Sequence, residues 1–168
     1  PDARLMVYAN AGWGLDEALR NVEALLPYRV ELIEQPVAKE DIAGMGKVQA
    51  NTPLPVFADE SVQTAEHVER LAEAGVSGIN LKLMKLGGLT PTLAIARRAR
   101  ELGLHLMLGS MIETSIGATA MAHLIGLAEW LDLDSPLLIA DDPFDGMIYD
   151  EAARVHLPER AGIGVKER

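Results

Sequence analysis

The stretch GINLKLMKLGGLTPTLAIARRARELGLHLML, residues 78–108, decides the fold class. Its two ends, GINLK and LHLML, are short apolar runs typical of buried strands. Between them, Thr90 and Pro91 mark the N-cap and the first residue of a helix that stops at Gly103. The stretch therefore predicts a strand–helix–strand unit with parallel strands.

Similar units repeat along the chain. Counted at residues 8, 34, 59, 82, 108 and 132, successive apolar runs lie 26, 25, 23, 26 and 24 residues apart. Amphipathic helical patterns fill the gaps, as in the first gap, where apolar residues recur at helical spacing from Leu15 to Leu26. We therefore predict six strands, at residues 4–8, 30–34, 54–59, 78–82, 104–108 and 129–134.

This repeat predicts an α/β fold, either a (β/α) barrel or an open doubly wound sheet. A closed barrel needs eight strands and typically about 250 residues, so six strands would make residues 1–135 a partial barrel. After residue 135 the period ends, and residues 136–168 are interpreted as an irregular or β-hairpin tail. The first strand follows Pro1 within three residues, which favours a piece of a longer protein.

The composition excludes several classes of protein. The chain has 168 residues, of which 49% are hydrophobic and 24% charged, which is enough apolar material for a core. Its net charge is −10 and it has no run of Lys or Arg, so neither nucleic acid nor an anionic membrane is an expected partner. It also lacks cysteine, a long apolar stretch and a basic–apolar leader, so we expect a cytoplasmic protein.

Polar side chains close the predicted strands. In either fold, ligands bind at the carboxyl ends of parallel strands, so these side chains would line one binding region. Carboxylates from adjacent strands suit Mg²⁺, and a lysine on the next strand could act as a base. The side chains at these ends are Tyr8, Glu34, Asp59, Lys82, Ser110 and the pair Asp132 and Asp134.

Other interpretations of single residues stay open. A Glu or Asp closing one strand is commonly a helix N-cap or a solvated loop residue, but the same placement in successive repeats favours a site. Asp132 and Asp134 would alternate along a strand and face one side, as a cation site, a second metal site or an exposed edge. His67 and His105 are expected to be structural, and the glycine pair in KLGGL, residues 85–89, to be a strand-to-helix turn.

Seven ordered motifs resemble one family. They are YANAGW (8–13), IEQPV (33–37), FADES (57–61), NLKLMKLGG (80–88), GSMIETSIG (109–117), DLDSP (132–136) and LPERAGIGV (157–165). In this order they are similar to the barrel and C-terminal segments of the enolase superfamily, in its muconate-lactonizing-enzyme-like subgroup. The resemblance is strongest to the dipeptide epimerases of the L-Ala-D/L-Glu epimerase type.

The resemblance implies strands three to eight of a modified (β/α)₇β barrel, a TIM-like barrel, with residues 136–168 as the tail that packs on a capping domain. It implies Mg²⁺-dependent epimerisation of an L-Ala-L-Glu-like dipeptide, through loss of the α-proton and an enediolate. By motif matching, Glu34 and Asp59 are metal ligands and Lys82 is the catalytic lysine. Asp132 and Asp134 would bind the substrate ammonium group, Ser110 would lie beside the substrate, and Lys85 would supply a supporting charge.

Two departures from the family pattern change the expectation for this chain. Tyr8 stands where the family has its first metal-binding aspartate, and a phenol is a poor Mg²⁺ ligand. The second catalytic lysine of the family lies outside the sequence. We therefore expect the chain to be inactive alone, with Mg²⁺ binding weak or absent, and to pair with another copy or with a complementing N-terminal part.

Two alternatives remain. The first is a non-catalytic fragment or pseudoenzyme that self-associates through open barrel edges. The second keeps the isomerase chemistry but changes the activity, to that of an N-succinylamino-acid racemase or an o-succinylbenzoate synthase. An acidic pair favours a dipeptide, because two anions attract an amine and repel an acidic substrate end.

Overall fold

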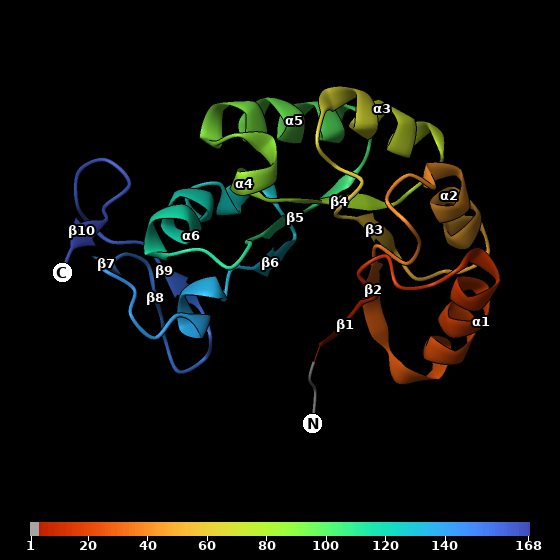
Figure 1. The fold of residues 1–168 in the computed structure, drawn as a ribbon, viewed down its shortest axis with the longest axis horizontal. Coiled ribbons are helices and arrows are strands. Elements are labelled where there is room, and N and C mark those ends of the chain that lie inside the picture. The colour runs from red at the N-terminus through yellow and green to blue at the C-terminus, as the bar shows by residue number, and fades with distance from the viewer. Residues whose placement is uncertain (1–3) are drawn as a thin grey trace. The chain divides into compact units, whose positions relative to one another are not determined.

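The computed structural model describes residues 4–168, in which short strands alternate with helices as the repeat predicts (Figure 1). The first six strands are β1 Leu5–Tyr8, β2 Val30–Glu34, β3 Val56–Ala58, β4 Gly78–Leu81, β5 His105–Gly109 and β6 Trp130–Asp132. The α-helices are α1 Leu15–Leu25, α2 Ile42–Ala50, α3 Ala65–Glu73, α4 Leu83–Leu86, α5 Leu89–Glu101 and α6 Ser115–Ala122. Of the helices in residues 4–168, none is long and apolar enough to cross a membrane.

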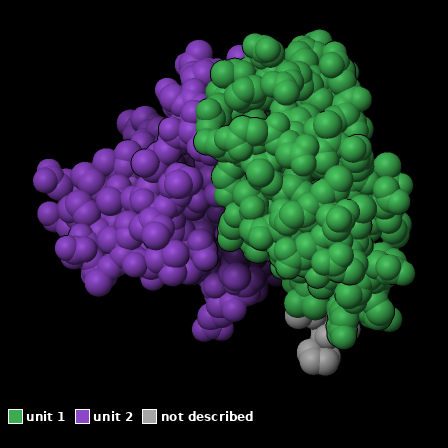
Figure 2. All heavy atoms as spheres, turned by 45° about the vertical axis from the view of Figure 1, so that its right-hand side comes forward, with its two compact units in different colours: residues 1–80, 97–105 green, residues 81–96, 106–168 purple. Residues whose placement is uncertain are grey.

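The six strands form one sheet in chain order, β1-β2-β3-β4-β5-β6. The described pairs β1/β2, β2/β3, β3/β4 and β5/β6 are all parallel. The predicted strand positions and the α/β class are therefore confirmed, with boundaries that shift by one or two residues. The chain divides into two compact units: unit 1 is residues 1–80 with 97–105, and unit 2 is residues 81–96 with 106–168 (Figure 2).

In unit 1 the strands β2 and β3 are buried almost throughout, as expected of parallel strands covered on both faces. Helices α1, α2 and α3 lie side by side along one face of β1–β3 (Figure 1). On the strands, Phe57 is in register with Gly78, and a Cβ at Gly78 would lie 2.5 Å from the phenyl ring. The missing side chain of Gly78 therefore makes room for the ring of Phe57.

Local signals set the helix ends in unit 1. The carboxylate of Asp41 accepts a hydrogen bond from the Gly44 N–H and caps α2, while the hydroxyl of Thr64 accepts one from the His67 N–H and caps α3. After α3, Gly75 takes the left-handed conformation, with φ of +80°, which is common just past the end of a helix. His67 lies on α3 and His105 in β5, the elements that the sequence predicts.

The glycine pair in unit 2 has a role that differs from the prediction. Gly87 and Gly88 do not join a strand to a helix; they end the one-turn helix α4, and both of their N–H groups donate to the Leu83 carbonyl. Helix α5 then begins at Leu89, one residue before the predicted N-cap Thr90. A four-residue helix is too short to produce a helical pattern in the sequence, which is why α4 was not predicted.

The C-terminal tail of unit 2 is irregular, as predicted, and contains antiparallel pairs of two-residue strands. Its elements are β7 Phe144–Asp145, β8 Ile148–Tyr149, β9 Val155–His156 and β10 Lys166–Glu167, in the pairs β7/β10 and β8/β9. The described residues also form the short 3₁₀ helices η1 Leu26–Tyr28, η2 Ile125–Leu127 and η3 Ser135–Leu138.

Asp142 fastens this tail to the start of α6. One carboxylate oxygen accepts hydrogen bonds from the Ser115 N–H and the Ser115 hydroxyl, both at 2.7 Å, and the other accepts the Phe144 N–H at 3.0 Å. Burial raises the pKa of Asp142, but the hydrogen bonds from Ser115 and Phe144 outweigh it and hold the pKa below the ordinary value of 3.8. The ionised carboxylate therefore stabilises the fold.

We expect Asp142→Asn to lower the free energy of unfolding by about 1–3 kcal/mol at pH 7, because the amide nitrogen would face an N–H donor. Since the folded-state pKa lies below the ordinary value of 3.8, the contribution is complete above that pH and is lost as the pH falls below it. Urea unfolding at pH 7 and at pH 3 measures this. Asp141→Asn, at the exposed neighbouring residue, is the control and should change little. Equal effects of the two substitutions would contradict the assignment.

Candidate functional site

Glu34 and Asp59 lie at the carboxyl ends of two adjacent strands of unit 1. Glu34 is the last residue of β2 and Asp59 directly follows β3. Glu34 pairs in register with Phe57, two residues before Asp59, so both carboxylates belong to the same face of the sheet. The exposed fractions of Glu34 and Asp59 are only 2% and 4%. Buried carboxylates are rare outside binding or paired arrangements.

Uncharged side-chain amides form hydrogen bonds with both Glu34 and Asp59. Asn80, in β4, donates from Nδ2 to Oε2 of Glu34 at 3.3 Å, across the intervening strand β3. Gln35 accepts the Asp59 N–H on its side-chain oxygen at 2.9 Å. Neither amide was predicted as a site residue. For Asn80 the available signal was a polar residue inside a fully buried strand, GINL.

Tyr8 ends β1 in register with Glu34, so the phenol stands beside the carboxylate position at the same level of the sheet. Its exposed fraction is 39% and its hydroxyl lies 4.0 Å from Sδ of Met6. The sequence interpretation of Tyr8 as the residue in register with Glu34 is therefore confirmed. A neutral phenol at this position supplies no third carboxylate.

The donor set of unit 1 fits a magnesium ion held by two carboxylates. Mg²⁺ commonly takes one or two carboxylates and completes its octahedral coordination with water and substrate oxygens. Within residues 4–168 no three His, Asp or Glu side chains gather into a metal site. Glu34 and Asp59 are the residues that would hold the ion.

Lys82 directly follows β4 and precedes α4, in an extended conformation, and its side chain is half-buried. Burial raises the pKa of the Glu113 carboxyl, while a hydrogen bond from the Met111 N–H and the positive charge of Lys82 act in the opposite direction. Lys82 and Glu113 are therefore electrostatically coupled within unit 2. Glu113 lies in the motif GSMIETSIG, but its sequence position alone did not link it to Lys82.

Ser110 and Asp132 are brought together at the ends of β5 and β6. Gly109 and Asp132 are in register, and the next residue, Ser110, donates its N–H to the Asp132 carbonyl at 3.1 Å. The Ser110 hydroxyl lies 3.4 Å from the same carbonyl oxygen. These two predicted site residues therefore share one strand end.

Asp132 and Asp134 do not alternate along a strand, which corrects the prediction. Strand β6 ends at Asp132, and Asp134 has helical dihedral angles, φ −86° and ψ −5°, as the N-cap of η3. Pro136 lies in the first turn of η3, and its fixed φ suits a helical turn rather than a continued strand. The two acids thus flank a turn.

Tyr149, from the tail, supports this acidic turn. Its hydroxyl donates to the carbonyl oxygen of Leu133, the residue between the two acids. Burial raises the pKa of Tyr149 to about 12, and the charges of Asp134 and Asp132 add to the effect, so the phenol stays a neutral donor at physiological pH. All three polar residues line a largely apolar pocket of about 410 Å³ in unit 2.

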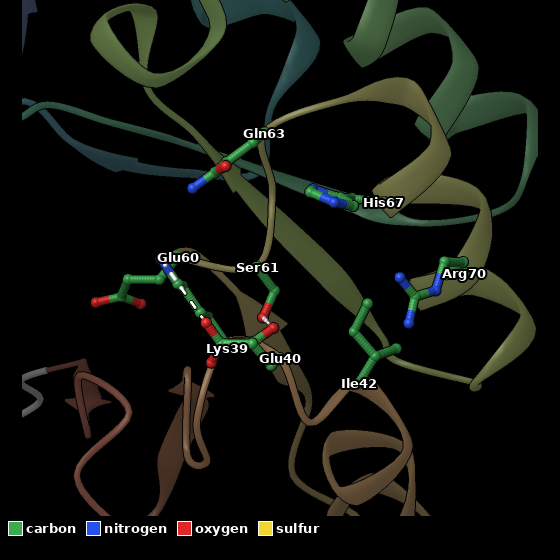
Figure 3. A pocket seen from close by; sticks show the side chains of 8 residues that line it. All are labelled: Lys39, Glu40, Ile42, Glu60, Ser61, Gln63, His67 and Arg70. Atoms are coloured by element: carbon green, nitrogen blue, oxygen red, sulfur yellow. Dashed lines mark hydrogen bonds and ion pairs between the residues drawn. The ribbon is translucent and has the colours of Figure 1, made fainter.

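A separate pocket of about 390 Å³ lies in unit 1 (Figure 3). It is formed by the loops after β2 and β3 and by α3, and contains neither Glu34 nor Asp59. Lys39 and Glu40 form an ion pair at 3.9 Å on its rim, and the Ser61 hydroxyl donates to the Lys39 carbonyl at 2.8 Å. Both positive and negative side chains line this pocket, so its charge favours no class of ligand.

Comparisons with known proteins place the chain in one family. The model of the family described as Enolase C-terminal domain-like matches residues 1–167. The L-Ala-D/L-Glu epimerase of Bacillus subtilis is 38% identical over 168 residues, covering 96% of this chain and 46% of the relative. An L-Ala-D/L-amino acid epimerase of Maribacter sp. is 38% identical over 163 residues, covering 97% and 48%. The chain thus spans about half the length of these relatives.

Solved structures show the same partial match. The dipeptide epimerase from Cytophaga hutchinsonii, complexed with Mg and the dipeptide D-Ala-L-Val, has a TM-score of 0.93 and 30% identity, covering 98% of this chain and 46% of that one. A substrate-liganded complex of the Bacillus subtilis epimerase has a TM-score of 0.91 and 36% identity, covering 97% and 47%. The fold is therefore part of an enolase-superfamily TIM-like barrel. The chain belongs to the Enolase C-terminal domain-like family.

Proposed function

We propose that this chain is the metal- and substrate-binding part of a Mg²⁺-dependent epimerase that acts on a dipeptide of the L-Ala-L-Glu kind. One observation carries the proposal: a charged or hydroxyl side chain lies at the carboxyl end of each of the strands β2 to β6. These are Glu34, Asp59, Lys82, Ser110 and the turn Asp132–Asp134. The names of the relatives support the activity, and the Cytophaga hutchinsonii complex supports the metal.

Each residue has a separate chemical task in this proposal. A bound Mg²⁺ would neutralise the charge that develops on the substrate carboxylate when the α-proton leaves, as in an enediolate. Glu34 and Asp59 would hold this ion at the carboxylate end of the substrate. Lys82 takes the α-proton on its Nζ in the neutral form and can return it from the same face.

The acidic turn would select substrates with a free amine. Asp132 and Asp134 attract an ammonium group, and the neutral phenol of Tyr149 keeps the turn between them in place. A succinylated amine carries a carboxylate instead and would be repelled. One structural neighbour, an N-succinyl Arg/Lys racemase from Bacillus cereus, is 27% identical, so this alternative substrate class belongs in the test.

Inversion of a stereocentre needs a proton donor on the opposite face, and by the family resemblance that donor would be a second lysine outside residues 1–168. We therefore propose that residues 1–168 alone do not epimerise, and that activity requires the complementing N-terminal half. Tyr8 weakens the metal site further because it replaces a charged ligand with a neutral phenol.

The test is a chimera in which residues 1–168, with Tyr8→Asp, replace the matching part of the Bacillus subtilis epimerase. We expect Mg²⁺-dependent exchange of the α-proton of L-Ala-L-Glu in D₂O, followed by proton NMR, and no exchange by the isolated chain. N-succinyl-L-Glu is assayed in parallel. A folded, Mg²⁺-binding chimera that exchanges no dipeptide would refute the dipeptide epimerase activity, and exchange of only the succinylated compound would favour the racemase.

A second candidate function is a non-catalytic, self-associating protein. It is favoured by the sheet order, which leaves β1 and β6 at the two edges. It is also favoured by exposed apolar side chains in unit 2, at Leu131, Leu137, Leu138 and Ile148. This function requires a stable oligomer whose melting temperature does not respond to Mg²⁺, whereas a monomer stabilised by Mg²⁺ would exclude it.

A further inference from the structure

Gln35 continues the pairing with β3 one residue after β2 has ended. Its backbone N–H donates to the carbonyl of Phe57, in the middle of β3, at 2.8 Å. The chain then turns away at Gln35, which has a left-handed φ of +40° and is completely buried. Beyond this turn, the side chain of Gln35 connects the loop after β2 to the loop after β3.

Every hydrogen-bonding group of this side-chain amide is used. Oε1 accepts the N–H of Asp59 at 2.9 Å and the N–H of Ser61 at 3.2 Å. Nε2 donates to Oγ of Ser61 at 2.9 Å and to the carbonyl of Val37 at 3.0 Å. A planar amide with four partners in two loops fixes their spacing in a way that an apolar side chain of similar size could not.

We propose that Gln35 is a positioning residue that sets the spacing of Glu34 and Asp59, and thereby the affinity of the chain for a divalent cation. The inference rests on the proposed function, because it takes these carboxylates as the metal ligands. Gln35 is the residue next to Glu34, and it bonds the backbone of Asp59 directly. It is therefore the sequence neighbour of Glu34 and is hydrogen-bonded to Asp59.

The expected loss of metal affinity can be taken from residues that hydrogen-bond to metal ligands in other proteins. Replacing a group that orients a ligand commonly lowers metal affinity by about 10–100-fold. Loss of Oε1 would also leave the Asp59 and Ser61 N–H groups buried without this acceptor, which frees the loop that carries Asp59.

Gln49 offers a matched control in the same unit. Its Oε1 accepts the Val56 N–H and the Ser77 hydroxyl, both at 2.7 Å, and its Nε2 donates to the carbonyls of Leu54 at 3.2 Å and Thr52 at 3.4 Å. It therefore makes the same number of bonds, three of them at or before the start of β3 and one to Ser77, just before β4. A purely structural role of Gln35 would make the two glutamines equivalent for metal binding.

The experiment compares Gln35→Met with Gln49→Met in the full chain, with and without Tyr8→Asp. Mn²⁺ affinity is measured by calorimetry, and hydrogen exchange of the Asp59 amide by NMR. We expect Gln35→Met to weaken Mn²⁺ binding about 10–100-fold and to speed exchange at Asp59, while Gln49→Met lowers the melting temperature but changes neither quantity. Gln35→Glu keeps the acceptor for the Asp59 N–H and changes only the donor side of the amide, so it should retain slow exchange at Asp59 even if Gln35→Met fails to fold.

The outcomes separate this inference from the proposed function. If Tyr8→Asp binds Mn²⁺ and Gln35→Met binds it equally well, or if both methionine variants weaken it alike, the positioning role is overturned while the metal site stands. If no variant binds Mn²⁺, including Tyr8→Asp, the proposed function and this inference fail together.

Discussion

Lys82→Met, introduced into the active chimera, is expected to lower the rate of α-proton exchange by about 10²–10⁴-fold, the range that a positioned general base contributes. Methionine keeps the unbranched shape of lysine but cannot take up a proton. Lys82 lies between β4 and α4 in an extended conformation, with φ of −131° and ψ of 126°. Methionine adopts this conformation as readily as lysine, so we expect no change in the backbone. The effect should therefore fall on the chemical step.

The measurement is D₂O exchange of the α-proton of L-Ala-L-Glu at saturating Mg²⁺, together with calorimetric Mg²⁺ affinity. Mg²⁺ affinity should stay within about twofold of the parent, because Lys82 is not among the proposed ligands. Lys47→Met, on the exposed side of α2, is the control and should retain full exchange. Unchanged exchange in Lys82→Met would remove this residue from the mechanism and with it the family's proton transfer.

Tyr8→Asp in the chain itself is expected to raise Mg²⁺ affinity by at least about tenfold, because a further carboxylate adds both charge and a hard oxygen ligand. Position 8 is in register with Glu34, so the new carboxylate enters at the level of the existing one. Without metal, the added negative charge should lower the melting temperature, since like charges in a partly buried site repel. With Mg²⁺ the order should reverse.

Calorimetric titration and thermal unfolding with and without Mg²⁺ test this pair of effects. Tyr28→Asp makes the same chemical change at an exposed tyrosine of unit 1, on η1, and should leave Mg²⁺ affinity unchanged. The assignment of position 8 to the metal site is lost if the two variants bind Mg²⁺ equally. A rise in affinity limited to Tyr8→Asp would identify tyrosine as the cause of weak binding.

The strands could be predicted because burial on both faces leaves a simple signal. Runs such as VELIE and GINL consist mostly of apolar residues and recur at a nearly constant spacing, which also places Glu34, Asp59 and Lys82 at strand ends. Asp134 was misplaced because apolar–acid alternation in EWLDLD looks like a strand. Pro136 and the 3₁₀ turn that it favours decide the conformation there.

The supporting residues could not be predicted for a different reason. Gln35 acts through partners 24 and 26 residues away in sequence, and Asn80 through Glu34, 46 residues away. Tyr149 likewise reaches Leu133 across 16 residues. Such bonds depend on which loops the fold brings together, and a pattern of local spacing carries no information about them.

The bond from Tyr149 to the Leu133 carbonyl has an evolutionary consequence. The proposed metal ligands are carried by the strands β2 and β3 or the residue after them, whereas the turn between the two acids is held by the irregular tail. Under the proposed function, substitutions in the tail would therefore change the recognition of the substrate's amino end without altering the proposed proton-transfer residue. New dipeptide preferences would then arise by substitutions in the tail, with the residues at the strand ends unchanged.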